Sequence, residues 1–198
     1  FKWIAKMIEE HPNMDFVGGG EESFGFMVGD FVRDKDAVTS TLLACEIAAL
    51  TKANGSSFFN ALIDLYTTYG LFKERLVSII KKGKTGAQEI QKLMDEARSS
   101  PPIKINGSSV IKIDDYQSSI SQNTTTSTAS GINIPKANVL IFTTEDGSRI
   151  ALRPSGTEPK IKYYISVNKT LKIASEFESV ELELEAKINE ILKAMNLE

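Results

Sequence analysis

The stretch LRPSGTEPKIKYYISV, residues 152–167, decides the fold because it contains both a strand and the loop that precedes it. In its second half apolar and polar side chains alternate, which predicts a β-strand with one buried face. In its first half, two prolines, a glycine and two hydroxyl side chains lie between an arginine and a lysine. A tight loop rich in hydrogen-bond donors is therefore expected beside a strand. The face predicted to be buried carries Ile161, Tyr163, Ile165 and Val167, and the other face carries Lys160, Lys162, Tyr164 and Ser166.

The residue types in the loop RPSGTEP suit an oxyanion. Arg153 offers a planar fork of N–H donors that matches two phosphate oxygens. Ser155 and Thr157 add hydroxyl groups, and Gly156 leaves room for an anion to approach the backbone. Lys160 follows as a second cation. These residues predict a phosphate site, and the alternative is a structural turn whose Arg153 and Lys160 face solvent.

The residues around this loop predict an α+β domain over 72–198, an antiparallel sheet with helices on one face. Two apolar runs, residues 138–144 and 148–153, flank an Asp-Gly pair at 146–147, which is a strong β-hairpin signal. Helical spacing of apolar residues predicts two helices in this part of the chain. A Ser/Thr-rich stretch at 117–131 has almost nothing to bury, so we expect a flexible loop there.

Residues 1–71 predict the C-terminal part of an α/β domain. The helix expected over 36–53 is apolar on most sides, so we expect it to be buried, with Asp34 or Asp36 as its N-cap. Few strand patterns accompany the helices, which indicates that the sheet of this domain is incomplete. The chain starts in a helical pattern at Phe1, and we expect it to be a piece of a longer protein.

Composition excludes several classes of function. The formal net charge of −3 over 198 residues gives no general attraction to nucleic acid or to an anionic membrane, and no apolar run approaches the length of a membrane span. The single cysteine, Cys45, cannot form an internal disulfide and is expected to be a buried thiol in a cytoplasmic protein. The single histidine, His11, is expected just past a helix end, before Pro12.

A second candidate loop, GGGEES, lies at 18–23. Carboxylates such as Glu21, next to the hydroxyl of Ser23, accept hydrogen bonds from a sugar diol or hold a cation. The alternative is an exposed turn without a ligand. The segment RDKD at 33–36 has two interpretations as well, since Lys35 suits a sugar phosphate but also suits a solvated helix start.

The order GGGEESFGF, then FVRDKDAV, then LRPSGTEPKIKYYI resembles the α-D-phosphohexomutases, the phosphoglucomutase/phosphomannomutase family. The resemblance covers nearly the whole chain. Members of this family have four domains and interconvert hexose 1-phosphate and hexose 6-phosphate. The resemblance implies that residues 1–71 are the end of the third domain and that residues 72–198 are the fourth, with a sheet like that of the TATA-binding protein.

The resemblance also implies roles for single residues. Glu21 and Ser23 would bind sugar hydroxyls, while Glu22 occupies the variable position between them. Lys35 lies in a segment that family members place near the reacting group, so it is a tentative catalytic residue. The residues implied to hold phosphate are Arg153, Ser155, Gly156 and Thr157, with Lys160 as a weaker candidate.

The chain departs from the family pattern in two places. It contains neither the serine segment that carries the phosphoryl group nor the carboxylate loop that binds magnesium. The resemblance therefore implies that both belong to missing N-terminal domains of the same protein. It also implies that this piece alone is inactive, because nothing in it donates a phosphoryl group to the hexose phosphate to form the hexose 1,6-bisphosphate intermediate. The alternative is a stand-alone, non-catalytic module that binds sugar phosphates.

The substrate is open between glucose, mannose and pentose phosphates. The motifs are most similar to those of glucose-directed or dual glucose/mannose members. Phe24-Gly25-Phe26 follows the acidic loop where phosphoglucosamine mutases usually carry a histidine, which argues against that branch.

Overall fold

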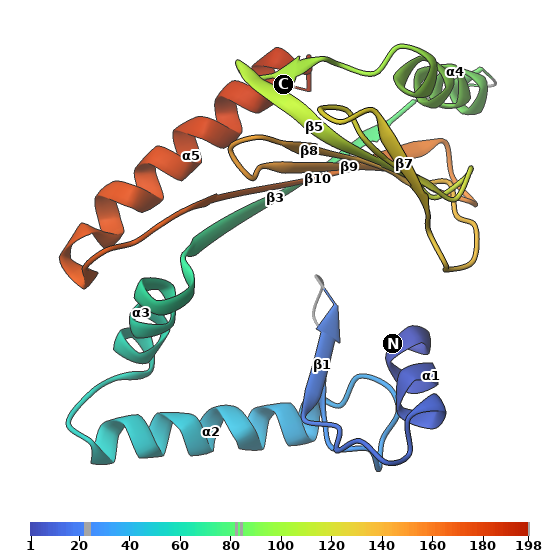
Figure 1. The fold of residues 1–198 in the computed structure, drawn as a ribbon. Coiled ribbons are helices and arrows are strands. Elements are labelled where there is room, and N and C mark those ends of the chain that lie inside the picture. The colour runs from blue at the N-terminus through green and yellow to red at the C-terminus, as the bar shows by residue number, and fades with distance from the viewer. Residues whose placement is uncertain (22–24, 82, 84, 198) are drawn as a thin grey trace. The chain divides into compact units, whose positions relative to one another are not determined.

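The computed structural model describes residues 1–21, 25–81, 83 and 85–197 (Figure 1). The chain divides into two compact units, Phe1–Asp64 and Leu65–Glu198. Among the described residues, no helix combines the length and the apolar character needed to cross a lipid bilayer.

The first unit pairs a short hairpin with helices. Strands β1 and β2 are antiparallel neighbours, and α2 packs against β2. Asp36 caps α2, because its carboxylate accepts hydrogen bonds from the backbone N–H groups of Val38 (3.0 Å) and Thr39 (3.3 Å). The elements are α1 (Lys2–Glu10), β1 (Gly18–Glu21), β2 (Gly25–Val28), α2 (Ala37–Ala53) and α3 (Phe58–Tyr69), which continues into the second unit.

The burial predicted for α2 is wrong in this unit. No residue of α2 is buried, and the side chains of Val38 and Leu50 are 80% and 63% exposed. A helix that is apolar on every side needs neighbours on every side, and the two-stranded sheet β1–β2 supplies one at most. The exposed apolar surface of α2 fits the expected incomplete α/β layer. Cys45, on this helix, is exposed as well, so the expectation of a buried thiol is also wrong.

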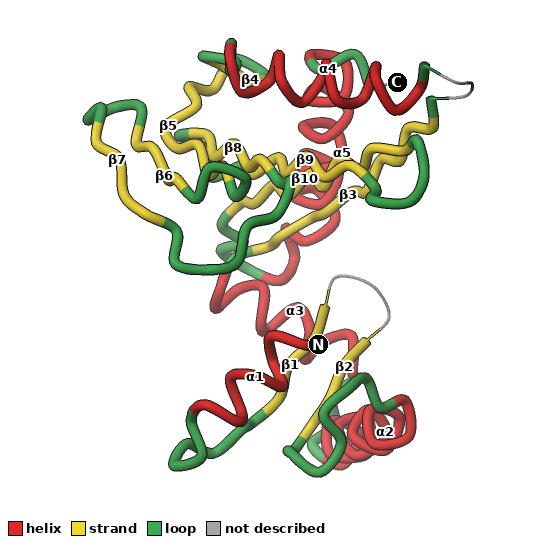
Figure 2. The backbone as a smooth tube through the Cα atoms, turned by 90° about the vertical axis from the view of Figure 1, so that its right-hand side faces the viewer, coloured by secondary structure: helices red, strands yellow, loops and turns green. Residues whose placement is uncertain are grey.

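The second unit is built on one antiparallel sheet (Figures 1 and 2). Its strand order is β3-β10-β9-β8-β5-β6-β7, and β4 pairs with β5. The strands are β3 (Leu71–Ile80), β4 (Lys104–Ile105), β5 (Ser108–Asp115), β6 (Ile120–Asn123), β7 (Thr128–Gly131), β8 (Leu140–Thr144), β9 (Arg149–Pro154) and β10 (Lys160–Lys169). The helices are α4 (Gly86–Ser99), α5 (Phe177–Ala194) and the short 3-10 helix η1 (Ala174–Glu176).

Helices α4 and α5 cover the same face of this sheet. Side chains from both helices and from three strands of the sheet line one apolar cavity of about 290 Å³ on that face. On β10, Ile161, Tyr163 and Val167 point into this core and are at most 3% exposed, as the alternation predicts. The alternate side chains of β10 from Lys160 to Asn168, such as Lys162, lie half-buried on the opposite face. The predicted antiparallel domain with helices on one face is therefore confirmed.

The Ser/Thr-rich stretch forms a hairpin. The flexible loop expected at 117–131 is instead described as β6 and β7, which extend the sheet beyond β5. Backbone pairing to β5 needs no apolar side chain. The turn is capped by Asn123, whose side-chain oxygen accepts hydrogen bonds from the N–H groups of Thr125 and Thr126, both at 3.0 Å.

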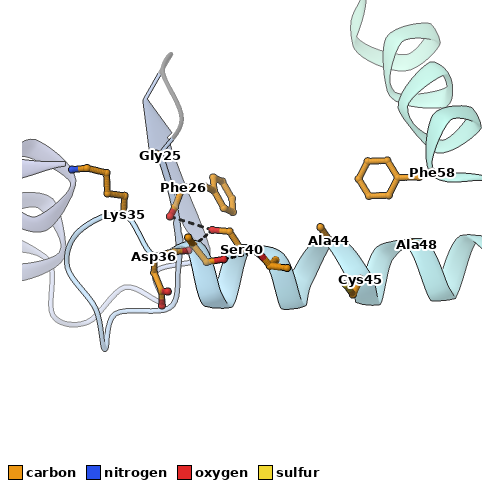
Figure 3. Close-up of a pocket in the computed structure, with 11 residues that line it drawn as sticks. Gly25, Phe26, Lys35, Asp36, Ser40, Ala44, Cys45, Ala48 and Phe58 are labelled. Atoms are coloured by element: carbon orange, nitrogen blue, oxygen red, sulfur yellow. Dashed lines mark hydrogen bonds between the residues drawn. The ribbon is translucent and has the colours of Figure 1, made fainter.

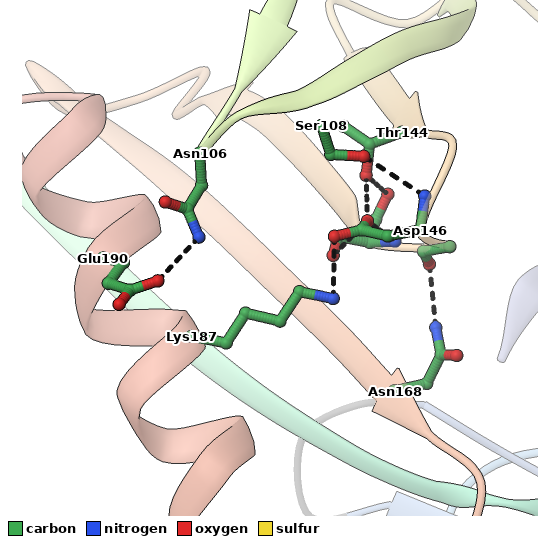
Figure 4. Close-up of polar contacts among 9 residues, drawn as sticks. Asn106, Ser108, Thr144, Asp146, Asn168, Lys187 and Glu190 are labelled. Atoms are coloured by element: carbon green, nitrogen blue, oxygen red, sulfur yellow. Dashed lines mark hydrogen bonds and ion pairs between the residues drawn. The ribbon is translucent and has the colours of Figure 1, made fainter.

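The predicted Asp-Gly hairpin between β8 and β9 is confirmed, and it is tied to α5 (Figure 4). Gly147 has φ +80°, a conformation that favours glycine. The Asp146 carboxylate accepts hydrogen bonds from the Thr144 hydroxyl (2.6 Å) and the Ser148 hydroxyl (2.8 Å), and it pairs with Lys187 of α5 (2.9 Å). Burial raises the pKa of Asp146, but these contacts outweigh burial and hold the pKa well below its ordinary value.

Candidate functional site

The loop RPSGTEP connects the neighbouring strands β9 and β10 and is fixed by backbone hydrogen bonds. The Ser155 N–H donates to the carbonyl of Lys160 at 2.7 Å, which closes the loop at its base. The Lys81 N–H, just after β3, donates to the Pro159 carbonyl at 2.9 Å. The loop is therefore anchored at its base and against the neighbouring strand end.

All five residues that we expected to hold phosphate line one polar cavity of about 400 Å³. Arg153 comes from the end of β9, Lys160 from the start of β10, and the other three from the loop between them. The Arg153 guanidinium is exposed and makes no hydrogen bond or ion pair within the described part of the chain. Its donors are free to meet a ligand. The cavity is lined by Arg153, Pro154, Ser155, Gly156, Thr157, Glu158, Lys160 and Lys162.

Lys162 is a site residue that the motif did not reveal. It lies directly opposite Arg153 in the register of β9 and β10, so both side chains project from the same sheet face. The alternation along β10 already placed Lys162 on the same face as Lys160. Its position beside Arg153 required the pairing of two strands, which the sequence does not state. The cavity thus has three cationic side chains.

One carboxylate, Glu158, lies among these cations. Its Oε2 atom is 2.7 Å from Nζ of Lys160, and its side chain is 61% exposed. The hydrogen bond from Lys160, followed by the charges of Lys160 and Lys162, lowers the pKa of Glu158. Glu158 is therefore ionised at neutral pH.

The loop backbone has free donors. The N–H of Thr157 reaches Oγ of Ser155 at 3.4 Å, whereas the amides of Gly156 and Glu158 make no hydrogen bond within the described ranges. A Cβ atom added at Gly156 would meet no atom within 4 Å. The atoms around Gly156 therefore leave room for a larger side chain or for a ligand against the backbone.

The candidate sugar site belongs to the first unit and is described in part. Glu21 ends β1, and its carboxylate contacts the amino group of Phe1. Ser23 and Glu22 lie outside the described residues, so the structure gives no geometry for their predicted roles.

Lys35 lies near this hairpin and is held as an ammonium ion. Its Nζ atom is 2.9 Å from Oδ1 of Asp34 and 5.1 Å from the centre of the Phe1 ring. The hydrogen bond to Asp34 chiefly raises the pKa of Lys35, and the charge of Glu21 adds to this effect. Lys35 therefore stays an ammonium ion at neutral pH and keeps its positive charge.

A mostly apolar cavity of about 910 Å³, larger than the one around Arg153, lies along α2 in the first unit (Figure 3). Lys35 and Asp36 lie at one end of it, and Phe58 lies at the other. In Figure 3 the ammonium group of Lys35 points away from α2.

The remaining candidates do not build a further site. His11 is exposed and donates its backbone N–H to the Met7 carbonyl at 3.1 Å, so it ends α1 as predicted. In the ranges that the structure describes, no group of three His, Cys, Asp or Glu side chains is placed to hold a metal ion.

Two family models match the chain. Residues 1–66 match the model described as phosphoglucomutase/phosphomannomutase, alpha/beta/alpha domain III. Residues 80–183 match the model described as phosphoglucomutase/phosphomannomutase, C-terminal domain.

Curated relatives and a solved structure agree with these matches. A phosphoglucomutase of Staphylococcus haemolyticus is 38% identical over 169 residues, covering 85% of this chain and 31% of that protein. A phosphoglucomutase of Staphylococcus aureus is 42% identical over 170 residues, covering 84% of this chain and 30% of that protein. The crystal structure of parafusin, a phosphoglucomutase from Paramecium, matches with a TM-score of 0.58 at 19% identity, covering 97% of this chain and 33% of that one, and supports the fold.

By its fold, the chain is an α/β unit followed by an α+β domain that carries a cationic loop between two neighbouring strands. It spans about a third of the length of the curated relatives that it matches. The chain belongs to the phosphoglucomutase/phosphomannomutase family, the α-D-phosphohexomutases, and the matched parts are its third and C-terminal domains. The family predicted from the motifs is confirmed.

Proposed function

We propose that this chain is the substrate-binding C-terminal portion of a phosphohexomutase that interconverts hexose 1-phosphate and hexose 6-phosphate. Membership of the family and the similarity to two phosphoglucomutases support this proposal. The observation that carries it is the gathering of all five expected phosphate residues around one cavity with a third cation, Lys162.

In this proposal the loop between β9 and β10 holds the phosphate group that is not reacting. Arg153 donates two N–H groups to a pair of phosphate oxygens, and Lys160 and Lys162 balance the remaining charge. The free amides of Gly156 and Glu158 donate to the same group. Because the loop is fixed by backbone hydrogen bonds, little order has to be gained when the ligand binds.

A fixed phosphate clamp suits a substrate that must bind in two orientations. Whichever end of the sugar reacts, the other end carries a phosphate that occupies the same clamp. Glu21 and Ser23 would hold sugar hydroxyls in both orientations, and Lys35, as an ammonium ion, would neutralise charge near the reacting oxygen.

The phosphoryl carrier and the metal lie elsewhere in this proposal. The family's serine segment and carboxylate loop have no counterpart in this sequence, so we assign them to other domains of a longer, cytoplasmic protein. Magnesium bound there would supply charge neutralisation for phosphoryl transfer. The residues of this chain would bind and orient the sugar phosphate and the hexose 1,6-bisphosphate intermediate.

Coupled assays on that longer protein test the proposed activity. Glucose, mannose, glucosamine and ribose 1-phosphates are offered separately, and turnover is expected with glucose 1-phosphate, mannose 1-phosphate or both. The 198-residue chain alone is expected to bind sugar phosphate without turnover. Turnover of none of the four substrates, together with intact binding, would instead support a non-catalytic sugar-phosphate module.

A further inference from the structure

Glu158 is the one carboxylate among the residues that line the phosphate cavity. Its Oε2 atom lies 2.7 Å from Nζ of Lys160, at the distance of a direct ion pair. A carboxylate at this place opposes the binding of any anion, because it competes for the Lys160 ammonium and repels negative charge. A carboxylate in a cavity proposed to bind phosphate therefore needs an explanation.

The side chain of Glu158 does not hold the loop together. The loop is closed by backbone hydrogen bonds, from Ser155 N–H to the Lys160 carbonyl and from Lys81 N–H to the Pro159 carbonyl. The side chain is 61% exposed, and the one ion pair that it makes with the described residues is with the end of a flexible lysine. Because an exposed ion pair contributes little to stability, removing this carboxylate should leave the loop intact.

The effect of Glu158 is instead on the charge of the cavity. Arg153, Lys160 and Lys162 contribute three positive charges, and Glu158 contributes one negative charge, which leaves 3 − 1 = +2. A phosphate monoester carries about −1.5 to −2 at neutral pH, so it neutralises this cavity almost completely. Without the carboxylate the cavity would carry +3 and would favour anions of higher charge.

We propose that Glu158 is a specificity-determining residue, which matches the charge of the loop to that of a phosphate monoester and competes with the ligand for Lys160. This inference rests on the proposed phosphate-binding function of the same loop. It predicts that the substitution Glu158→Gln tightens the binding of anions, and that the gain increases with the charge of the anion.

Calorimetric titrations of the 198-residue chain at about pH 8 test this inference. The probes are methyl sulfate with one negative charge, inorganic phosphate with about two, and pyrophosphate with about three. Coulomb attraction screened by water and salt predicts gains of about twofold, fourfold and eightfold in affinity for Glu158→Gln. Thermal melting of the variant checks that the fold is intact.

A matched control separates a local effect from a change in net charge. Glu96 on α4 is 67% exposed and pairs with Lys92 at 3.7 Å, outside the phosphate cavity. Glu96→Gln changes the net charge by the same amount and is expected to leave all three affinities unchanged.

The outcomes distinguish this inference from the function on which it rests. Unchanged or weaker phosphate binding by Glu158→Gln, or an equal gain for all three probes, would overturn the specificity role. The phosphate function would still stand in that case if Arg153→Ala weakened phosphate binding about tenfold. Phosphate binding that is absent in the unaltered chain, or insensitive to Arg153→Ala, would overturn the phosphate function and this inference with it.

Discussion

Replacing Arg153 by alanine tests the proposed clamp at its strongest donor. The substitution removes the planar fork of N–H groups and one of three positive charges from the cavity. A charge-assisted hydrogen-bonding contact contributes about 1.5–3 kcal/mol, and the exposure of Arg153 favours the lower end of this range for its guanidinium as a whole. We expect a loss of about 1.5 kcal/mol, which weakens phosphate binding about tenfold.

The structure also predicts what Arg153→Ala leaves unchanged. Since the guanidinium has no partner within the described part of the chain, the free energy of unfolding should change by less than about 0.5 kcal/mol. The control is Arg149→Ala, which removes an exposed arginine from the same strand, outside the cavity. Calorimetric titration with inorganic phosphate and glucose 6-phosphate gives the affinities. Equal affinity of the two variants for phosphate would refute the assignment of the clamp.

Three further predictions follow from the contacts. Gly156→Ala should leave thermal stability unchanged, because no atom lies near the added Cβ, but should weaken phosphate binding severalfold in the same titration. Asp146→Asn should lower the free energy of unfolding by about 1 kcal/mol at neutral pH, because charge-assisted hydrogen bonds and a partly exposed pair with Lys187 are lost. Because the pKa of Asp146 is lowered in the folded protein, its contribution to the free energy of unfolding is complete above the ordinary carboxyl pKa of about 4 and is lost as the pH falls further. The denaturation curves of the unaltered chain and of Asp146→Asn should therefore converge in acid. Glu21→Ala in the longer enzyme should reduce turnover with little change in melting temperature, and a collapse of stability would indicate a structural role.

The parts of the fold that sequence predicted are those with a strong local pattern. The alternation on β10 and the Asp-Gly turn at 146–147 each depend on a few neighbouring residues, and both are confirmed. The hairpin at 120–131 was missed because its side chains carry no pattern, and its strands form through backbone pairing with β5. The burial of α2 was wrong because burial depends on neighbours in space.

In the candidate site, too, the sequence predicted the local features and missed the contacts between separate segments. The motif predicted Arg153 and the loop, because the residue types that suit phosphate follow one another in the sequence. Lys162 was found only from the register of β9 and β10, which places it opposite Arg153. The ion pair of Glu158 with Lys160 was found only from the side-chain positions in the structure. Neither strand register nor side-chain contacts can be read from the motif.

A crystal structure of the longer protein with bound glucose 1-phosphate would show where the phosphate group binds. We expect the phosphate group to lie against the Arg153 guanidinium and the Gly156 amide, and the sugar hydroxyls to reach Glu21. A bound ligand elsewhere, with the cavity around Arg153 empty, would contradict this expectation.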